Sequence, residues 1–192
     1  DPACANSVIG AGAYKAEGDG PGGFLAGYSS RGPTVDERLK PDIAAPGVDV
    51  VSSINSFTTI SYDEVTTVNF NGQDYPFGTL GGTSMAAPAT SGCAALLLEA
   101  APFATPAEIK EALLNNARTD NFTGAIPLQG STAWGMGKVN AYHAVVDLLG
   151  VAGMDEALGN EVLVWPNPTE DALSVALDAV PDNARYALLD LT

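Results

Sequence analysis

Residues 81–88 read Gly81-Gly82-Thr83-Ser84-Met85-Ala86-Ala87-Pro88 and are the most informative segment of the chain. The two glycines permit a tight turn and the close approach of a ligand to the backbone. Small and apolar residues continue to position 100, which predicts a helix over 84–100 that is buried on most sides. At its start, a serine has free backbone N–H groups and the positive end of the helix dipole beside it, which suits a nucleophile in acyl transfer. Thr83 and Ser84 equally suit ordinary N-capping.

Strand patterns precede this helix. Residues 8–13 are a short run of Val, Ile, Gly and Ala and predict a buried strand. Residues 42–45 and 49–54 are two further short segments, and a turn is predicted between them at Pro46-Gly47.

A long polar insert, residues 55–80, leads directly into the glycine pair. Within it, residues 65–70 alternate like a strand and Asn71-Gly72 indicates a hairpin turn. Because the insert adjoins Ser84, it either lines a cleft beside that serine or decorates the surface.

Two more helices are predicted after residue 100. Thr105 suits an N-cap, the proline that follows suits the first helical position, and Glu108 completes a capping box. Asn140 suits the N-cap of the other helix, which ends before Gly150. Helices thus alternate with strands up to residue 150, which predicts an α/β domain.

Charge excludes several classes of function. The 192 residues include 8 Lys and Arg against 23 Asp and Glu, so the formal net charge is −15. This charge argues against nucleic acid and against an anionic membrane surface as partners. Residues 151–192 hold 8 acidic residues and 1 basic residue, against 15 and 7 in residues 1–150, so the composition changes near Gly150.

The segment from Gly82 to Pro88 resembles the nucleophile motif of the subtilisin-like serine proteases, the subtilases. Residues 28–34 and 40–47 resemble the stretch that precedes the nucleophile in that family, and residues 134–141 resemble the closing segment of its domain. The resemblance covers residues 1–149 in family order. It implies an α/β fold with a subtilisin-like parallel sheet and a Ser-His-Asp triad that hydrolyses peptide bonds.

This resemblance gives Ser84 the role of nucleophile toward the scissile peptide carbonyl. The Ser84 backbone N–H would donate to the oxyanion, and Gly82, Thr83 and Met85 would lie beside the oxyanion or the substrate. The family's Asp-Thr-Gly, His-Gly and Ala-Gly-Asn segments, which carry the triad partners and the oxyanion asparagine, do not occur in these 192 residues. We therefore expect a C-terminal half of a catalytic domain, inactive alone, whose partner residues lie upstream.

Two other functions compete with this interpretation. One is a catalytically dead subtilase fold that serves as a binding or structural module, which an intact nucleophile motif disfavours. The other is an α/β-hydrolase, because Ser84, Asp120 and His143 occur in the order of that family's triad, and His143 is the only histidine. That fold needs a Gly-x-Ser-x-Gly elbow, whereas the second residue after Ser84 is Ala86.

No cofactor is required by the family's chemistry, but the resemblance implies a cation site. Some subtilases bind a cation between an aspartate and two backbone carbonyls. Asp42 matches that aspartate, and the carbonyls of Asn6 and Val8 would complete a set of oxygen ligands that suits calcium. The alternative is a solvated Asp42 without an ion.

The two cysteines do not have the spacing of a metal site. Cys93 lies in the apolar run and is expected to be a buried free thiol. Cys4 lies in a polar segment, and its pairing is left open.

The C-terminal residues point to export. Residues 162–165 and 173–177 read as strands around Pro166-Asn167-Pro168, as at the start of a small β-sandwich. They resemble the opening of the C-terminal sorting domain of the type IX secretion system; the alternative is a linker before an unrelated β-module. We expect a linker at 150–160, a truncated sorting domain at 161–192, and a secreted or cell-surface protein. Its partners would be the secretion machinery and a polypeptide substrate.

Overall fold

The computed structural model describes residues 2–16, 23–55, 57 and 60–150, together with strand residues 163–164 and 175–176. The chain divides into two compact units, Asp1–Gly150 and Val151–Thr192. In the second unit, β6 (Leu163–Val164) pairs antiparallel with β7 (Val175–Ala176). Both strands fall within segments for which strands were predicted. The Pro-Asn-Pro turn and the remainder of the sorting-domain resemblance lie outside the described residues.

A parallel strand pair forms the base of the first unit. β1 (Ala11–Lys15) and β2 (Ile43–Val48) pair so that Ala13 lies opposite Ala45. The predicted turn at Pro46-Gly47 is wrong, because both residues belong to β2. A Cβ at Gly47 would lie 2.7 Å from the Cβ of Ala13, so this glycine allows the strands and helix to pack closely. The chain turns instead at Asp49, whose φ is 51°.

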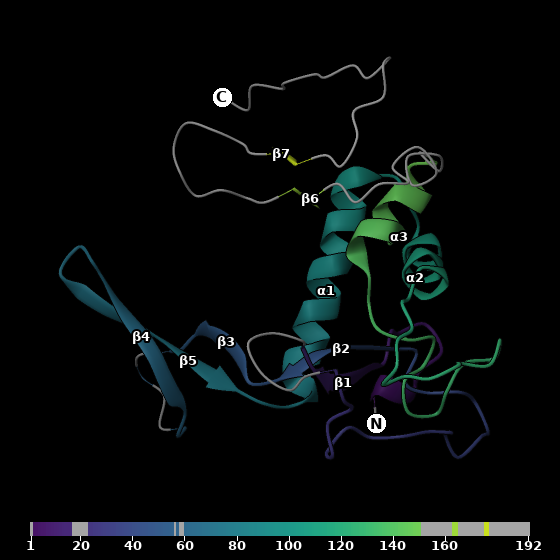
Figure 1. The fold of residues 1–192 in the computed structure, drawn as a ribbon, viewed down its shortest axis with the longest axis horizontal. Coiled ribbons are helices and arrows are strands. Elements are labelled where there is room, and N and C mark those ends of the chain that lie inside the picture. Colours follow the sequence, from purple (N-terminus) through teal and green to yellow (C-terminus); the bar gives the residue numbers. More distant parts are fainter. Residues whose placement is uncertain are drawn as a thin grey trace. The chain divides into compact units, whose positions relative to one another are not determined.

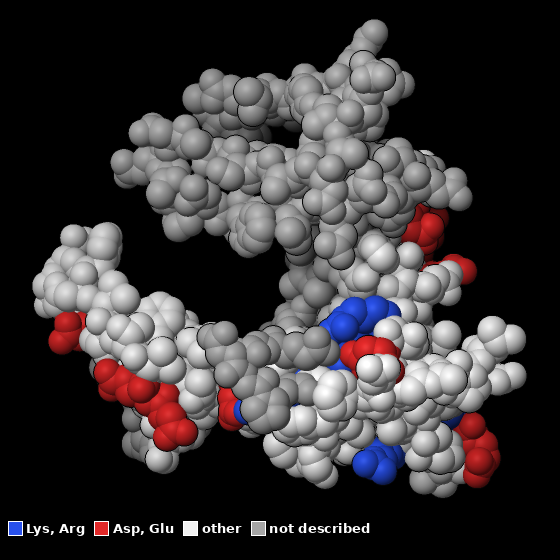
Figure 2. All heavy atoms as spheres, viewed as in Figure 1, with Lys and Arg blue, Asp and Glu red and all other residues white. Residues whose placement is uncertain are grey.

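Two strands of the insert and the strand that precedes it form a three-stranded antiparallel sheet in the order β3-β5-β4. Its strands are β3 (Val50–Ser53), β4 (Asp63–Phe70) and β5 (Gln73–Leu80). The predicted Asn71-Gly72 hairpin is confirmed, with φ values of 52° and 76°. The β4–β5 hairpin extends away from the helices (Figure 1). Its acidic side chains, Asp63, Glu64 and Asp74, are exposed, and acidic atoms gather on the hairpin in Figure 2.

The first unit has three helices: α1 (Thr83–Ala100), α2 (Pro106–Asn115) and α3 (Ala141–Leu148). Helix α1 packs on both parallel strands, and α2 and α3 pack on α1. The predicted capping box is confirmed, because the Thr105 hydroxyl accepts from the Glu108 N–H and the Glu108 carboxylate accepts from the Thr105 N–H. Asn140 caps α3 by accepting from the N–H of His143. Within the described ranges, no helix is both long and apolar enough to cross a membrane.

The prediction that α1 is buried on most sides is wrong for the described structure. Only Ala86, Thr90 and Leu97 of this helix are buried, whereas Leu96 and Leu98 are 52% and 44% exposed. The neighbouring elements cover only one stripe along α1, although apolar residues occur on all of its faces.

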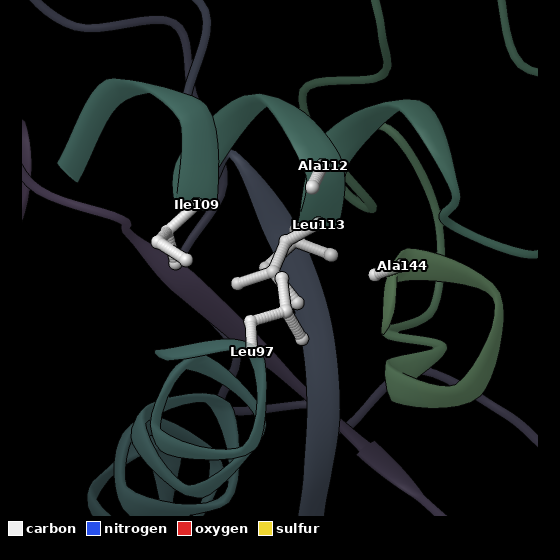
Figure 3. Close-up of a cluster of buried hydrophobic side chains, with 6 residues drawn as sticks. Leu97, Ile109, Ala112, Leu113 and Ala144 are labelled. Atoms are coloured by element: carbon white, nitrogen blue, oxygen red, sulfur yellow. The ribbon is translucent and has the colours of Figure 1, made fainter. Parts of the chain in front are cut away.

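The main hydrophobic core lies where the three helices meet. Leu97 of α1 packs with residues of α2 and with Ala144 of α3 (Figure 3). The fully or nearly fully buried members are Ile43, Leu97, Ile109, Ala112, Leu113 and Ala144. Cys93 packs against this cluster as a partly buried free thiol, and burial raises its pKa.

We expect Leu97→Ala to lower the free energy of unfolding of the full-length protein by about 2–5 kcal/mol, because it removes buried methyl groups and leaves a cavity. Its neighbour Leu96 is exposed, so Leu96→Ala is a matched control expected to cost only about 0.5 kcal/mol. Urea-induced unfolding followed by far-UV circular dichroism measures both variants. Equal losses would contradict this assignment of the core.

Candidate active site

The backbone of the glycine pair fixes the start of α1. Gly82 has a φ of 153°, a conformation that favours glycine, and its N–H donates to the Gly47 carbonyl at 2.7 Å. The Met85 N–H donates back to the Gly82 carbonyl at 3.0 Å. The first bond attaches the turn to β2 and the second closes the turn itself, and together they position Ser84 as the second residue of α1.

The Ser84 side chain is exposed. Nothing in the described part of the chain forms a hydrogen bond with its hydroxyl. Ser91, two turns later on the same helix, instead donates its hydroxyl proton to the carbonyl of Ala87 at 3.1 Å. The N–H of Ser84 belongs to the first helical turn, where amides lack intrahelical acceptors. An available hydroxyl and a backbone donor at a positive helix end form an arrangement that supports attack on a carbonyl and binding of the resulting oxyanion.

A pocket of about 350 Å³ lies beside this serine. Ser84, Met85 and Pro88 line it from α1, together with residues of β3, just before the insert, and of β5, the last strand of the insert. The base of the insert, by which we mean residues 78–80 at the end of β5, therefore borders the nucleophile candidate. Most of β4 and the hairpin tip are exposed. Thr83 lines a second pocket of about 240 Å³, together with residues 30–34, Lys40 and Cys4. Cys4 is a partly buried free thiol there.

The geometry disfavours the Ser84-Asp120-His143 arrangement. His143 is exposed on α3, and its ring lies 5.5 Å from that of Tyr142. Tyr142 lines a pocket with Leu96 in the C-terminal half of α1. Position 96 lies about 18 Å along the helix from Ser84, at 1.5 Å per residue. His143 is therefore far beyond hydrogen-bonding distance of the candidate nucleophile.

Asp120 has a different and structural role. It accepts from the Lys138 ammonium at 2.5 Å and from the N–H groups of Phe122 and Thr123. Lys138 is fully buried and lies over the rings of Tyr14, Phe122 and Trp134, at 4.7–5.4 Å from their centroids. Burial acts to raise the pKa of Asp120, but the bonds from Lys138, Thr123 and Phe122 outweigh it, so the pKa is lowered.

A pH dependence follows from this pair. Because the folded-state pKa of Asp120 lies below its unfolded value of about 3.9, its contribution to stability is fully present above about pH 5 and is lost as the pH falls through the folded pKa. We expect Asp120→Asn to destabilise the full-length protein at pH 7, and the gap to wild type to narrow below about pH 4. Urea unfolding between pH 2.5 and 7 measures the gap, and a pH-independent gap would contradict the assignment.

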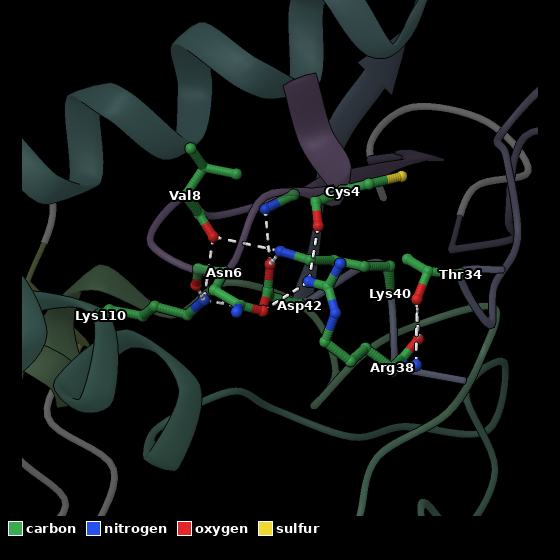
Figure 4. A network of polar contacts seen from close by, with 9 residues as sticks. Cys4, Asn6, Val8, Thr34, Arg38, Lys40, Asp42 and Lys110 are labelled. Carbon is green, nitrogen blue, oxygen red and sulfur yellow. Dashed lines mark hydrogen bonds and ion pairs between the residues drawn. The ribbon is translucent and has the colours of Figure 1, made fainter. Parts of the chain in front are cut away.

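The oxygens predicted to bind calcium come together, but around ammonium groups (Figure 4). Lys110 on α2 lies 2.9 Å from Asp42 Oδ1, and Lys40 lies 2.5 Å from Asp42 Oδ2. Both ammonium groups also donate to the carbonyl of Val8, at 2.9 and 3.2 Å. Burial acts to raise the pKa of Asp42, but these donors and the Gly10 N–H lower it overall.

Comparison with known proteins gives consistent matches. The sequence model of the Subtilase family matches residues 1–159. Serine protease AprX of Bacillus subtilis (strain 168) is 42% identical over 123 residues, which are 63% of this chain and 25% of that protein. The chain therefore spans about a quarter of the length of this relative.

Two solved structures share the fold. One is a protease of Pseudoalteromonas arctica, with 30% identity and a TM-score of 0.55 over 77% of this chain and 38% of that one. The other is fervidolysin of Fervidobacterium pennivorans, a keratinolytic enzyme related to subtilisin. It shows 32% identity and a TM-score of 0.52, over 75% of this chain and 20% of that one.

Proposed function

Since this chain belongs to the subtilase family, we propose that it is the C-terminal part of the catalytic domain of a serine endopeptidase, with Ser84 as its nucleophile. The observation that carries the proposal is the exposed Ser84 hydroxyl at the start of α1, where it borders a pocket. The glycine turn that precedes Ser84 is hydrogen-bonded to β2. The family match supports the reaction class, and the geometry supports the choice of residue.

In this mechanism Ser84 Oγ attacks the scissile peptide carbonyl while a histidine accepts the hydroxyl proton. The negative charge that develops on the carbonyl oxygen is stabilised by the Ser84 N–H and by the α1 dipole. The amine leaves with the proton from the histidine, and water then hydrolyses the acyl-enzyme. His143 is too far from Ser84 to be that histidine. We place the histidine, its aspartate and the oxyanion asparagine in the upstream part of the catalytic domain.

The neighbours of Ser84 fit contacts with a polypeptide. Met85 and the apolar side chains of β3 and β5 line the pocket next to the nucleophile, where a substrate side chain adjacent to the scissile bond would bind. Gly82 allows the backbone to approach the substrate, and Thr83 supports the turn that holds the oxyanion donor. The base of the insert thereby becomes part of the substrate cleft.

Export remains part of the proposal. We assign residues 1–149 to the catalytic domain, 150–160 to a linker and 161–192 to the start of a type IX sorting domain, which would bring the protein to the cell surface or the medium. The family match ends at residue 159, close to the proposed boundary. The resemblance of residues 162–175 to sorting domains supports the assignment of the tail.

The experiment compares peptide and ester turnover by the full-length protein with turnover by residues 1–192 alone. We expect the full-length protein to cleave unfolded casein and fluorogenic peptides, and a sulfonyl fluoride to stop both reactions. We expect residues 1–192 to cleave neither. Folded full-length protein that turns over esters but no peptide would favour the hydrolase alternative, and one that turns over neither would favour the inactive module.

A further inference from the structure

The acceptors around Lys110 match an ammonium group. Its Nζ lies 2.9 Å from Asp42 Oδ1, 2.9 Å from the Val8 carbonyl oxygen and 3.3 Å from the Asn6 carbonyl oxygen. An ammonium has three N–H donors and no acceptor, so these three oxygens satisfy it. Calcium instead takes six to eight oxygens at about 2.3–2.6 Å.

The second carboxylate oxygen of Asp42 is occupied as well. Oδ2 accepts from Lys40 Nζ at 2.5 Å and from the Gly10 N–H at 2.7 Å. Both oxygens that would ligate a metal therefore already have donors. The side chains of Asp42, Lys40 and Lys110 are 12%, 11% and 23% exposed, so water screens their charges less than it does at the surface.

Electrostatics also disfavour a divalent ion here. Two ammonium groups face one carboxylate, which leaves a local excess of one positive charge. Arg38 adds another cation nearby, donating from Nη1 to the Cys4 carbonyl at 2.6 Å and to Asn6 Oδ1. Asp36 pairs with Arg38 Nε at 2.7 Å and neutralises the Arg38 charge. It does not offset the excess positive charge of the two lysines. A calcium ion would therefore meet net repulsion, and the residues present do not fit the cation that the family resemblance implied.

We propose that Lys110, together with Lys40, takes the place of a bound metal ion at the oxygens of Asn6, Val8 and Asp42, and that this site contributes stability without divalent cations. Lys110 belongs to α2, the two carbonyls precede β1, and Asp42 precedes β2. Its ammonium thus joins three separate chain segments, as a shared metal ion would, but it is attached covalently to one of them. The proposal concerns stability and is independent of whether Ser84 is catalytic.

The first test measures the Tm of the full-length protein and of its Asp42→Asn variant in EDTA and in millimolar CaCl2. Calcium bound elsewhere in the protein shifts both proteins equally, so the difference between them isolates this site. We expect the same loss of Tm on substitution in both buffers, because Asp42 pairs with lysines. A loss several degrees larger in CaCl2 than in EDTA would show that calcium binds Asp42 and would overturn the proposal.

The second test, which stands even if Asp42→Asn does not fold, uses Lys110→Met. Loss of the ammonium leaves three oxygens without their donor, so we expect the Tm in EDTA to fall by about 3–8 °C. We also expect CaCl2 to raise the Tm of this variant more than that of wild type. The control is Lys15→Met, which removes the same charge from the exposed pair with Asp49. A Tm in EDTA equal to that of the control, or equal calcium responses of variant and wild type, would overturn the proposal.

Discussion

Ser84→Ala should lower kcat of the full-length protein on peptides on the order of 10⁶-fold, the size of loss that follows removal of a serine nucleophile from a triad. KM should change little, because the hydroxyl contributes to the transition state rather than to binding of the substrate. Without Oγ no acyl-enzyme forms, and what remains is the stabilisation given by the oxyanion donors.

The control for this prediction lies on the same helix. Ser91 is exposed like Ser84, but its hydroxyl donates to the Ala87 carbonyl. Ser91→Ala therefore also removes a serine hydroxyl from α1, but at a position distant from the glycine turn. We expect that variant to keep wild-type kcat. Retention of more than about one hundredth of wild-type activity by Ser84→Ala would remove Ser84 from the mechanism.

The second large effect is expected at the buried lysine. Lys138→Met should lower the free energy of unfolding by about 3 kcal/mol, because the largely buried Asp120 carboxylate would lose its ammonium partner and retain the more distant Arg118 guanidinium, at 3.4 Å. The contacts of the ammonium with the three aromatic rings would be lost as well. Urea-induced unfolding of the full-length protein at pH 7 measures the loss.

Lys15→Met provides the comparison for Lys138. Lys15 forms a pair with Asp49 at 2.9 Å, but the two side chains are 33% and 63% exposed, so this pair should contribute about 0–1 kcal/mol. Similar losses in the two variants would mean that burial does not determine the strength of the Lys138 interaction. Recovery of part of the Lys138→Met loss by Asp120→Asn in the double variant would support the poorly compensated Asp120 charge as the cause.

Features encoded by neighbouring residues were predictable from the sequence. Thr105 and Glu108 specify a capping box three residues apart, and Asn71-Gly72 specifies a hairpin by its two backbone conformations. The start of α1 follows from Gly82 for the same reason. Such features need no knowledge of the rest of the fold, since the interacting groups are adjacent in the chain.

Features determined by distant contacts were not predictable. Gly47 signals a turn locally, yet Ala13 on the neighbouring strand requires a glycine within β2 at that position. The burial of Lys138 depends on Asp120 and on aromatic rings from other segments, and no local pattern marks it. Lys110 lies 102 residues from Val8, so its place at the predicted cation site became apparent only in the structure.

The candidate site divides in the same way. Residues 82–88 identify Ser84 through a resemblance to the subtilases. The pocket beside it is lined by β3 and β5 as well as by α1, and no sequence motif marks these strands as its walls. Sequence therefore indicated the candidate nucleophile, whereas the structure was needed to place the base of the insert beside it.

Covalent labelling of the full-length protein with a fluorophosphonate tests the central claim most directly. This reagent reacts with a serine whose hydroxyl is activated by a base and whose oxyanion is stabilised. We predict one adduct per molecule, located on Ser84 by mass spectrometry of the digested protein and absent from unfolded protein. An adduct on another residue, or no adduct on protein that hydrolyses peptides, would contradict the assignment of Ser84 as the nucleophile.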